Sequence, residues 1–389
     1  MTIDQDRLFM RMALAEAKKG LGRTSPNPCV GAVIVREGRV VGRGYHKKAG
    51  TPHAEIHALA EAGLQARGGT MYVTLEPCNH TGLTPPCSHA VARAGLARVV
   101  IGVCDPNPVA SGGIHYLADH GITVCSGVCG EECRQINLPF LKWLSTGLPW
   151  VVMKAGLSLD GRITCQKGRG NAITGPESRA LVHRLRDRVD AILIGAQTLA
   201  IDNPSLTTRY ADGDAGRDPL RIILDTGLRS DPACRIFHQD SPAETWIYCG
   251  EDASTARQTV LEETGARVFR VGVTSRGHVD LRDMLTHLAG NNILSLLVEG
   301  GATVHGSFLA AHLVDEVCLF MAPFFIGDQG DPLLSGYSVA DRESALPLVR
   351  LRMRQVGTDC LLYGSFQEPA GWCPIVCTTR PDPGNGSSG

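Results

Sequence analysis

Short apolar runs suited to β-strands alternate with amphipathic helical segments along most of the chain. In the first third, a helical pattern over 6–21 precedes two β-rich runs, 30–35 and 40–45, which the turn at 36–38 predicts to be a hairpin. A helical pattern over 53–66 and further strand and helix patterns follow. This alternation predicts an α/β fold in which helices are layered on a sheet.

The same alternation resumes after residue 150 and continues to the apolar run 293–298. Between the two parts, two prolines and a glycine interrupt an apolar segment at 139–149, which is typical of a linker. The end of the chain, from 367, lacks periodicity and contains PDPGNGSSG. We therefore predict two α/β domains, 1–145 and 150–366, followed by a disordered tail over 367–389.

The composition excludes several classes of protein. The 38 Lys and Arg residues nearly balance the 39 Asp and Glu residues, so no overall positive charge is present to hold nucleic acid. No run approaches the roughly 18 apolar residues of a membrane span, and the acidic start MTIDQDRLFM does not resemble a signal peptide. The 14 Cys among 389 residues are too few for a disulfide scaffold. We expect a cytoplasmic protein that binds neither nucleic acid nor membranes.

Candidate catalytic groups of the first domain lie in two short segments at the ends of predicted elements. His53 would lie at a helix start with Glu55 two residues on, so that both side chains can reach one point outside the helix. Cys78 follows a strand, and a loop rich in Pro and Gly leads from it to Cys87 and can fold back to bring the two thiols together. One His and two Cys form the ligand set of a catalytic zinc site, whose fourth position holds water. A carboxylate beside the site, here Glu55, can transfer protons.

The order of these groups matches the signature of zinc nucleobase deaminases, H-x-E followed by P-C-x-x-C, except that the second Cys comes nine residues later instead of three. A closed structural zinc site is the alternative, with His80 as a fourth protein ligand. Three further cysteines, Cys125, Cys129 and Cys133, are spaced four apart, but their segment reads as a strand and loop, and we expect them to be ordinary buried residues.

In the second part, the apolar run 293–298 leads into Gly300-Gly301 and a helix from about residue 303. A strand that passes through glycines into a helix suits phosphate, because backbone N–H groups and the helix dipole face the turn. A tight turn without a ligand is the alternative. Glu299, Asp202 and Arg209 add polar groups where such sheets bind ligands, and Arg186 fits either a solvated helix face or a substrate phosphate.

These residues resemble a known family, the bifunctional pyrimidine deaminase/reductase of riboflavin biosynthesis. Four segments of the first part follow its deaminase half in order: PNPCVGAVIV (26–35), GYHKKAGTPHAE (44–55), YVTLEPCNHTGLTPPC (72–87) and DPNP (105–108). The resemblance implies a cytidine-deaminase-like three-layer α/β/α domain. It also implies that His53, Cys78 and Cys87 are zinc ligands and that Glu55 is the catalytic proton carrier.

The resemblance continues through KAGLSLDGRIT (154–164), AILIGAQTLAIDNPSLTTR (191–209), ILDTGLR (223–229) and LVEGGATVHGSF (297–308). It implies a dihydrofolate-reductase-like α/β domain that binds NADPH. On matched positions, the residues implied to face the cofactor are Ala172, Thr198, Asp202, Thr226, Gly301, Ala302, Thr303, Val304, His305, Gly306 and Ser307. Those implied to face the substrate are Lys154, Arg186, Leu206, Arg209 and Glu299, with Asp160 as a further candidate.

Two positions depart from the family pattern. Ala172 stands where the family often has Trp, which removes a stacking surface for the cofactor. The run 111–113, Ser-Gly-Gly, replaces the usual Gly-Lys/Arg-Gly and removes a cation that could meet the substrate phosphate. Lys47, Lys48 or Arg43 could take its place.

By this resemblance, zinc-dependent deamination of 2,5-diamino-6-ribosylamino-4(3H)-pyrimidinone 5′-phosphate precedes NADPH reduction of its ribosyl group to ribityl. The expected partner is this phosphorylated small molecule, and we expect a homo-oligomer. One alternative is a deaminase whose second domain is a non-catalytic scaffold or nucleotide sensor. Another is a nucleic-acid-editing deaminase, which would need a positive groove and stacking aromatic residues, whereas this chain is 5% aromatic.

Overall fold

A computed structural model of the chain describes residues 2–82, 85–170, 172–210, 213, 216–367 and 376–378. The chain divides into two compact units. Unit 1 comprises residues 1–145 and the C-terminal segment 369–389, and unit 2 comprises residues 146–368. Each unit contains its own sheet, so each is described separately.

Unit 1 contains a six-stranded sheet in the order β15-β5-β4-β3-β1-β2. Its strands are β1 (Gly31–Arg36), β2 (Arg39–Tyr45), β3 (Thr70–Leu75), β4 (Arg98–Val103), β5 (Thr123–Ser126) and β15 (Val376–Thr378). Its helices are α1 (Ile3–Ala17), α2 (Ala54–Ala62), α3 (Cys87–Arg93), α4 (Gly113–Asp119) and α5 (Gly130–Gln135), and α6 (Leu138–Thr146) spans the boundary to unit 2. The hairpin predicted from the turn at 36–38 is confirmed, since β1 and β2 pair antiparallel.

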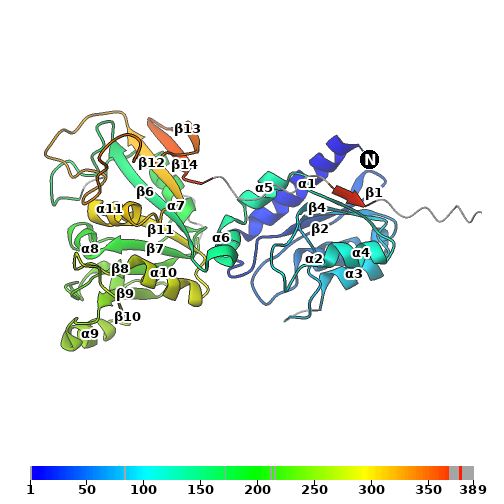
Figure 1. Cartoon of the computed structure of the whole chain (residues 1–389), viewed down its shortest axis with the longest axis horizontal. Coiled ribbons are helices and arrows are strands. Elements are labelled where there is room, and N and C mark those ends of the chain that lie inside the picture. The colour runs from blue at the N-terminus through cyan, green and yellow to red at the C-terminus, as the bar shows by residue number, and fades with distance from the viewer. Residues whose placement is uncertain are drawn as a thin grey trace, which may run out of the picture. The chain divides into compact units, whose positions relative to one another are not determined.

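Helices cover both faces of this sheet, because alternate residues of each strand point to opposite sides. Ala32 and Ile34 of β1 join a core with α2, α3 and α4, whereas Val33 and Val35 join a second core with α1 and α5. Figure 1 shows α1 and α5 on one side of the sheet and α2, α3 and α4 on the other. The expected three-layer α/β/α arrangement is confirmed.

Unit 2 contains a nine-stranded sheet in the order β10-β9-β8-β7-β11-β6-β12-β14-β13. Its strands are β6 (Trp150–Ser158), β7 (Ala191–Gly195), β8 (Leu220–Leu224), β9 (Thr245–Gly250), β10 (Arg267–Val271), β11 (Ser295–Gly300), β12 (Glu316–Ala322), β13 (Arg350–Val356) and β14 (Asp359–Ser365). Its helices are α7 (Pro176–Arg186), α8 (Ala196–Asp202), α9 (Thr255–Glu262), α10 (Leu281–Gly290) and α11 (Ala302–Ala310).

The strands from β10 to β12 are parallel, and β14 and β13 add an antiparallel edge. Apolar residues of β7 and β11 fill cores on both faces, one with α10 and α11 and the other with α8 and α9. The chain passes from β6 to β7 and later returns to insert β11 between them. Parallel sheets bind ligands beyond the carboxyl ends of their strands at such a reversal of strand order.

One segment differs from the sequence prediction, and another is only partly described. The segment expected to be a linker is largely helical, as α6, because Pro139 lies in its first turn, where a missing N–H costs no helical hydrogen bond. The predicted disordered tail lies outside the described residues, apart from Gln367 and β15, which pairs antiparallel with β5. Within the described ranges, none of the helices has the length and apolar character needed to cross a membrane.

Candidate active sites

The first site is a cavity of about 290 Å³ in unit 1, which we call pocket A. Its walls include the first turn of α2, the segment after β3 and the loop after β4, together with residues before β1 and after β2. The residues used below that line it are Asn27, His46, His53, Glu55, Glu76, Cys78, His80, Asp105, Asn107 and Ala110. The two short segments singled out in the sequence therefore meet in one cavity.

The predicted zinc ligands converge at pocket A. His53 is the N-cap residue of α2, Cys78 follows β3, and Cys87 is the first residue of α3. The Nδ1 atom of His53 lies 3.6 Å from Sγ of Cys78 and 3.3 Å from Sγ of Cys87. All three candidate ligand atoms lie within 4.8 Å of one another. One nitrogen and two sulfur atoms at this separation fit the donor set of zinc.

The electrostatics of the site also favour metal binding, because thiolates rather than thiols are metal ligands. The pKa of Cys78 is lowered to about 4, since the Cys87 thiol donates a hydrogen bond to it and the His53 imidazole adds another. The backbone N–H of Cys87 also donates to Sγ of Cys78, at 3.4 Å. Cys78 is therefore prepared to act as an anionic ligand.

Glu55 lies in the first turn of α2 and is 3% exposed. Burial raises its pKa to about 7. Its Oε2 atom is buried and finds no hydrogen-bond partner in the described part of the chain. Glu55 is thus a carboxyl group whose second oxygen is free to exchange a proton with a bound molecule.

The alternative of a closed four-ligand site receives no support from the geometry. His80 lines pocket A, but it does not belong to the close group of ligand atoms found among the described residues. Cys125, Cys129 and Cys133 lie on β5, at the N-cap of α5 and within α5, and they form no such group there either.

Sequence reasoning did not assign several polar residues that line pocket A, among them Asn27, His46, Glu76, Asp105 and Asn107. Asn27 Nδ2 lies 3.1 Å from Nε2 of His46, whose Nδ1 lies 3.3 Å from the carbonyl oxygen of Pro52. The motif that contains Asp105 and Asn107 follows a strand end and could have indicated them. Asn27 and His46 are polar residues in other loops, and no comparable motif indicates a role for them.

The cations suggested as replacements for the missing one do not line pocket A in the part of the chain that the structure describes. Lys47 and Lys48 are exposed. Arg43 approaches Glu16 at 3.8 Å, and its backbone N–H donates to Glu61.

The second site is a cavity of about 590 Å³ in unit 2, which we call pocket B. It lies at the carboxyl ends of β7 and β11, where the order of the strands reverses. Gly301 begins the turn from β11 into α11 with φ 91°, and a Cβ atom there would lie 2.8 Å from Oγ1 of Thr198. The predicted glycine turn is therefore part of the wall of a large cavity.

A partly buried ion network crosses one end of pocket B. Arg186, the last residue of α7, makes two contacts with the carboxylate of Glu299, at 2.8 and 2.9 Å. Lys154 Nζ lies 3.4 Å from the same carboxylate. Burial alone would raise the pKa of Glu299, but the charges of Arg186 and Lys154 outweigh burial, and the pKa is lowered. Arg186 is therefore not a solvated helix charge.

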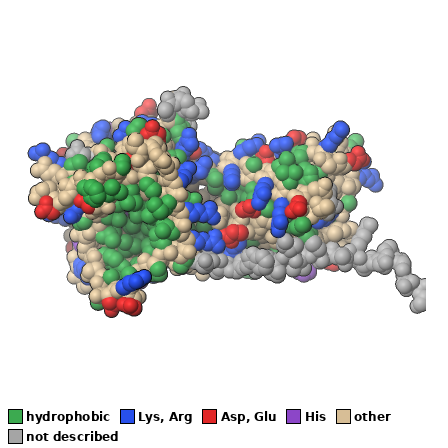
Figure 2. Space-filling view, turned by 90° about the horizontal axis from the view of Figure 1, so that it is seen from above, with side chains coloured by type: hydrophobic (Ala, Val, Ile, Leu, Met, Phe, Trp, Pro, Cys, Tyr) green, Lys and Arg blue, Asp and Glu red, His purple; other side chains and the backbone are tan. Residues whose placement is uncertain are grey.

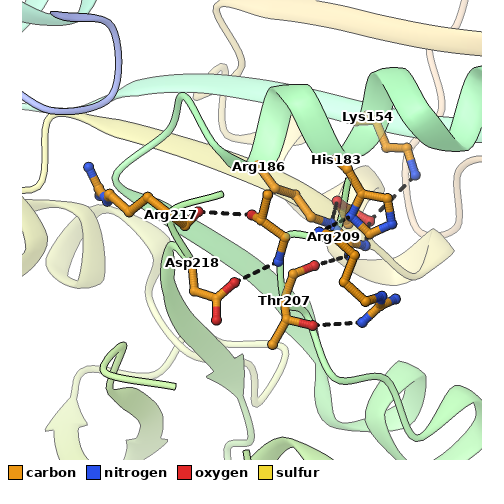
Figure 3. A network of polar contacts seen from close by, with 9 residues as sticks. Lys154, His183, Arg186, Thr207, Arg209, Arg217 and Asp218 are labelled. Atoms are coloured by element: carbon orange, nitrogen blue, oxygen red, sulfur yellow. Dashed lines mark hydrogen bonds and ion pairs between the residues drawn. The ribbon is translucent and has the colours of Figure 1, made fainter. Parts of the chain in front are cut away.

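The network extends to the loop after α8, as Figure 3 shows. Arg186 donates to the carbonyl oxygen of Thr207 at 3.1 Å, and Arg209 donates to the Thr207 hydroxyl at 2.6 Å. The backbone N–H of Arg209 donates to Nδ1 of His183 at 3.2 Å. These contacts hold the guanidinium group of Arg209 at the margin of pocket B, where an anionic ligand could meet it.

Most residues predicted for the second site line pocket B. They are Lys154, Ala172, Arg186, Thr198, Asp202, Arg209, Glu299, Gly301, Ala302, Thr303, Val304 and His305. His305 is 1% exposed, and burial lowers its pKa to about 4, so its imidazole is neutral. Ala172 is exposed, and its methyl group presents no ring to a ligand.

The remaining predicted residues lie away from the lining of pocket B. Leu206 is a core residue, and Thr226 follows β8. Gly306 packs against the backbone of Ser335, and Ser307 is the residue after it in α11. Asp160 accepts hydrogen bonds from the backbone N–H groups of residues 326 and 327, and so joins two segments that are far apart in the sequence. Spacing along a motif cannot distinguish lining residues from those that support the lining.

Comparison with known proteins assigns a family to each unit. Residues 3–103 match the "Cytidine and deoxycytidylate deaminase zinc-binding region", and residues 149–362 match the "RibD C-terminal domain". The chain is 40% identical over 359 residues to the riboflavin biosynthesis protein RibD of Bacillus amyloliquefaciens, covering 92% of this chain and 95% of the relative. It is also 40% identical over 375 residues to RibD of Escherichia coli (strain K12), covering 92% and 99%.

Solved structures agree along most of the chain. RibD of Acinetobacter baumannii, form 1, superposes with a TM-score of 0.83 at 32% identity and covers 97% of this chain and 100% of that structure. A diaminohydroxyphosphoribosylaminopyrimidine deaminase/5-amino-6-(5-phosphoribosylamino)uracil reductase of Thermotoga maritima gives 0.81 at 34% identity, covering 93% and 99%. The resemblance drawn from the motifs is confirmed, and this chain belongs to the RibD family of riboflavin biosynthesis proteins.

Proposed function

We propose that this chain catalyses two consecutive steps of riboflavin biosynthesis, one in each unit. In unit 1, water displaces the amino group of 2,5-diamino-6-ribosylamino-4(3H)-pyrimidinone 5′-phosphate, and ammonia leaves. In unit 2, NADPH reduces the ribosyl group of the deaminated product to ribityl. The observation that carries the proposal is the convergence of His53, Cys78 and Cys87 beside a carboxyl oxygen of Glu55 that has no hydrogen-bond partner among the described residues.

In unit 1, His53, Cys78 and Cys87 would hold zinc. When bound, zinc supplies Lewis-acid activation of water at neutral pH. Glu55 holds a proton at Oε2 and can pass it to the amino group that leaves, because this oxygen is committed to no other described group. Asn27 and His46 lie on the wall of the same cavity and would orient the pyrimidine ring through hydrogen bonds.

In unit 2, NADPH would bind along the turn from β11 into α11 and beside Thr198 and Asp202. When bound, NADPH supplies the hydride. Arg186 and Lys154 hold Glu299 ionised at the end of β11, so the carboxylate can accept hydrogen bonds from sugar hydroxyls. Arg209 offers a cation to the substrate phosphate.

Two alternatives weighed from the sequence receive less support. The match of residues 149–362 to the RibD C-terminal domain favours a reductase over a non-catalytic scaffold. The relatives that match along nearly the whole chain are riboflavin biosynthesis proteins, which favours a small-molecule substrate over nucleic acid. A cytoplasmic location remains a prediction.

The test measures both reactions on the purified protein. With the diamino substrate we expect release of ammonia, and with the deaminated substrate we expect oxidation of NADPH. Removal of zinc with a chelator should abolish the release of ammonia but leave NADPH oxidation with the deaminated substrate unchanged. Unimpaired release of ammonia by metal-free protein would contradict the assignment of unit 1, and absence of NADPH oxidation would contradict that of unit 2.

We also propose that the chain forms a homo-oligomer through one face of β12, β14 and β13. Cross-strand partners Leu319, Leu362 and Met353 share this face, and Met353 is 63% exposed. On the same face Leu351 is 53% exposed. Figure 2 views unit 2 from the side on which these strands lie in Figure 1, and hydrophobic side chains gather there. Exposed apolar patches of this kind mark protein contacts.

Placing charges on this apolar face provides the test. Replacing Leu351 and Met353 with Arg should shift the sedimentation of the protein to that of a single chain. An unchanged sedimentation coefficient would contradict an interface at this face.

A further inference from the structure

Glu76 is a second buried carboxylate in pocket A, and its position differs from that of Glu55. It follows β3 directly, two residues before Cys78, and is 6% exposed. Its Oε1 atom accepts hydrogen bonds from the backbone N–H groups of Gly112 and Ile114, both at 3.0 Å. Its Oε2 atom accepts from the backbone N–H of Asp105 at 3.1 Å. Both oxygens are therefore occupied by backbone groups of the loop after β4 and of the first turn of α4.

The loop that Glu76 holds, residues 105–112, forms one wall of pocket A. Asp105, Asn107 and Ala110 of this loop line the cavity. Glu76 binds the loop at both of its ends, because Asp105 begins it and Gly112 is the N-cap residue of α4. A buried carboxylate with three backbone donors is a strong anchor, since charge-assisted hydrogen bonds are about twice as strong as neutral ones.

Two further contacts join the loop 105–112 and the start of α4 to the segment after β3. The backbone N–H of Asn79 donates to the carbonyl oxygen of Ala110 at 2.9 Å. Gly113 lies so close to the chain that a Cβ atom there would be 2.0 Å from the carbonyl oxygen of Pro77. The loop therefore rests directly on the segment that carries Cys78.

We infer that Glu76 is a positioning residue that fixes the 105–112 wall of pocket A and thereby sets the affinity of unit 1 for its pyrimidine substrate. This inference rests on the proposed deaminase function. The zinc ligands and Glu55 come from α2, the end of β3 and α3. A loosened wall should therefore weaken substrate binding, because binding must then also order the loop, while the chemical step is largely preserved.

The test compares Glu76→Gln with a matched control, Asp6→Asn. Asp6 is also a buried carboxylate of unit 1 with three hydrogen bonds, from the Tyr72 hydroxyl and twice from Arg98, but it does not line pocket A. In Glu76→Gln, the amide cannot accept from all three backbone donors. We expect KM for the diamino substrate to rise about tenfold and kcat to change less than about threefold. In Asp6→Asn, KM should stay at the wild-type value.

A structural readout and a second variant complete the test. Hydrogen exchange of the backbone amides of Asp105, Gly112 and Ile114 should accelerate in Glu76→Gln but not in Asp6→Asn. Gly113→Ala, which pushes the loop from the other side, should raise KM in the same way and serves if Glu76→Gln does not fold. An unchanged KM in the folded variants, an equal rise in Asp6→Asn, or a fall of kcat larger than the rise of KM would overturn the inference. Wild-type protein that releases no ammonia would instead overturn the proposed function.

Discussion

Three buried glutamates show how surroundings give one residue type different tasks. Glu55 keeps an oxygen without a partner in the described chain and can exchange a proton. Glu76 binds three backbone N–H groups and holds a loop. Glu299 lies between two cations and stays ionised. Hydrogen-bond partners, rather than burial alone, determine what each carboxyl group can do.

The carboxyl group of Asp105 provides a pH-dependent prediction. Burial raises its pKa from the ordinary 3.8 to about 6. The unfolded chain thus loses this proton at lower pH than the folded chain, so ionisation costs stability as pH rises from about 4 to 6, and the full cost is present above pH 6. Asp105→Asn should therefore increase the free energy of unfolding by about 3 kcal/mol at pH 7 and leave it nearly unchanged at pH 4.

Urea unfolding at the two pH values measures this difference. The Asn side chain keeps an oxygen for the hydrogen bond from the backbone N–H of Asn107, so only the charge changes. A variant less stable than wild type at pH 7 would contradict the prediction.

The contribution of Glu299 to stability depends on pH in the opposite direction. Its folded pKa lies below the ordinary 4.5, so its contribution to stability is fully present above pH 4.5 and is lost as pH falls further. Glu299→Gln leaves Arg186 and Lys154 without their counter-charge and should destabilise unit 2 by about 3 kcal/mol at pH 7, less at pH 4. Thermal unfolding with the exposed Glu263→Gln as control measures this effect, and equal stability of the two variants would refute it.

For individual residues, the sequence predicted the candidate site where its chemistry needs an unusual combination of residue types. His53, Glu55, Cys78 and Cys87 stand in an order that ordinary packing does not require. The role of Glu76 could not be predicted, because its partners are backbone groups from residues 105–114, and the sequence does not say which loop lies against which strand end.

The elements that carry function are strand ends and the first turns of helices. His53 is the N-cap residue of α2, Cys87 is the first residue of α3, and Gly301 is the N-cap residue of α11. The strands before or beside these residues are apolar throughout or alternate regularly between apolar and polar residues. The sequence pattern therefore predicts these strands. Strand β13 was not predicted, because its sequence RLRMRQV places Arg on one face and exposed apolar residues on the other. Leu351 and Met353 on its apolar face are exposed, so the strand lacks the alternation of buried and exposed residues by which a pattern indicates a strand.

The turn at Gly301 can be tested as an element. Its φ of 91° is unfavourable for a residue with a side chain, and a Cβ atom would lie 2.8 Å from Oγ1 of Thr198. Gly301→Ala should therefore distort the wall of pocket B and raise KM for NADPH about tenfold. Titration of NADPH with the deaminated substrate measures this change. Release of ammonia is the internal control, and an unchanged KM for NADPH would contradict a cofactor site at this turn.

On the scale of the whole molecule, the chain consists of two units with separate sheets, cores and pockets. The strand and helix alternation predicts two α/β parts, because each sheet needs helices on both faces. The boundary is harder to predict, since α6 contains Pro139, one of the two prolines that suggested a linker, and ends before the other, Pro149. Because each pocket is lined by one unit only, a change in either pocket should affect one reaction and leave the other intact.

The most direct test of this account is Glu55→Gln. The substitution removes the proton-carrying oxygen of pocket A but leaves His53, Cys78 and Cys87 in place. We expect one zinc per chain as in wild type, a loss of ammonia release of about 10²–10⁴-fold, and unchanged oxidation of NADPH with the deaminated substrate. Release of ammonia at the wild-type rate would contradict the central claim that unit 1 is a deaminase in which Glu55 moves the proton.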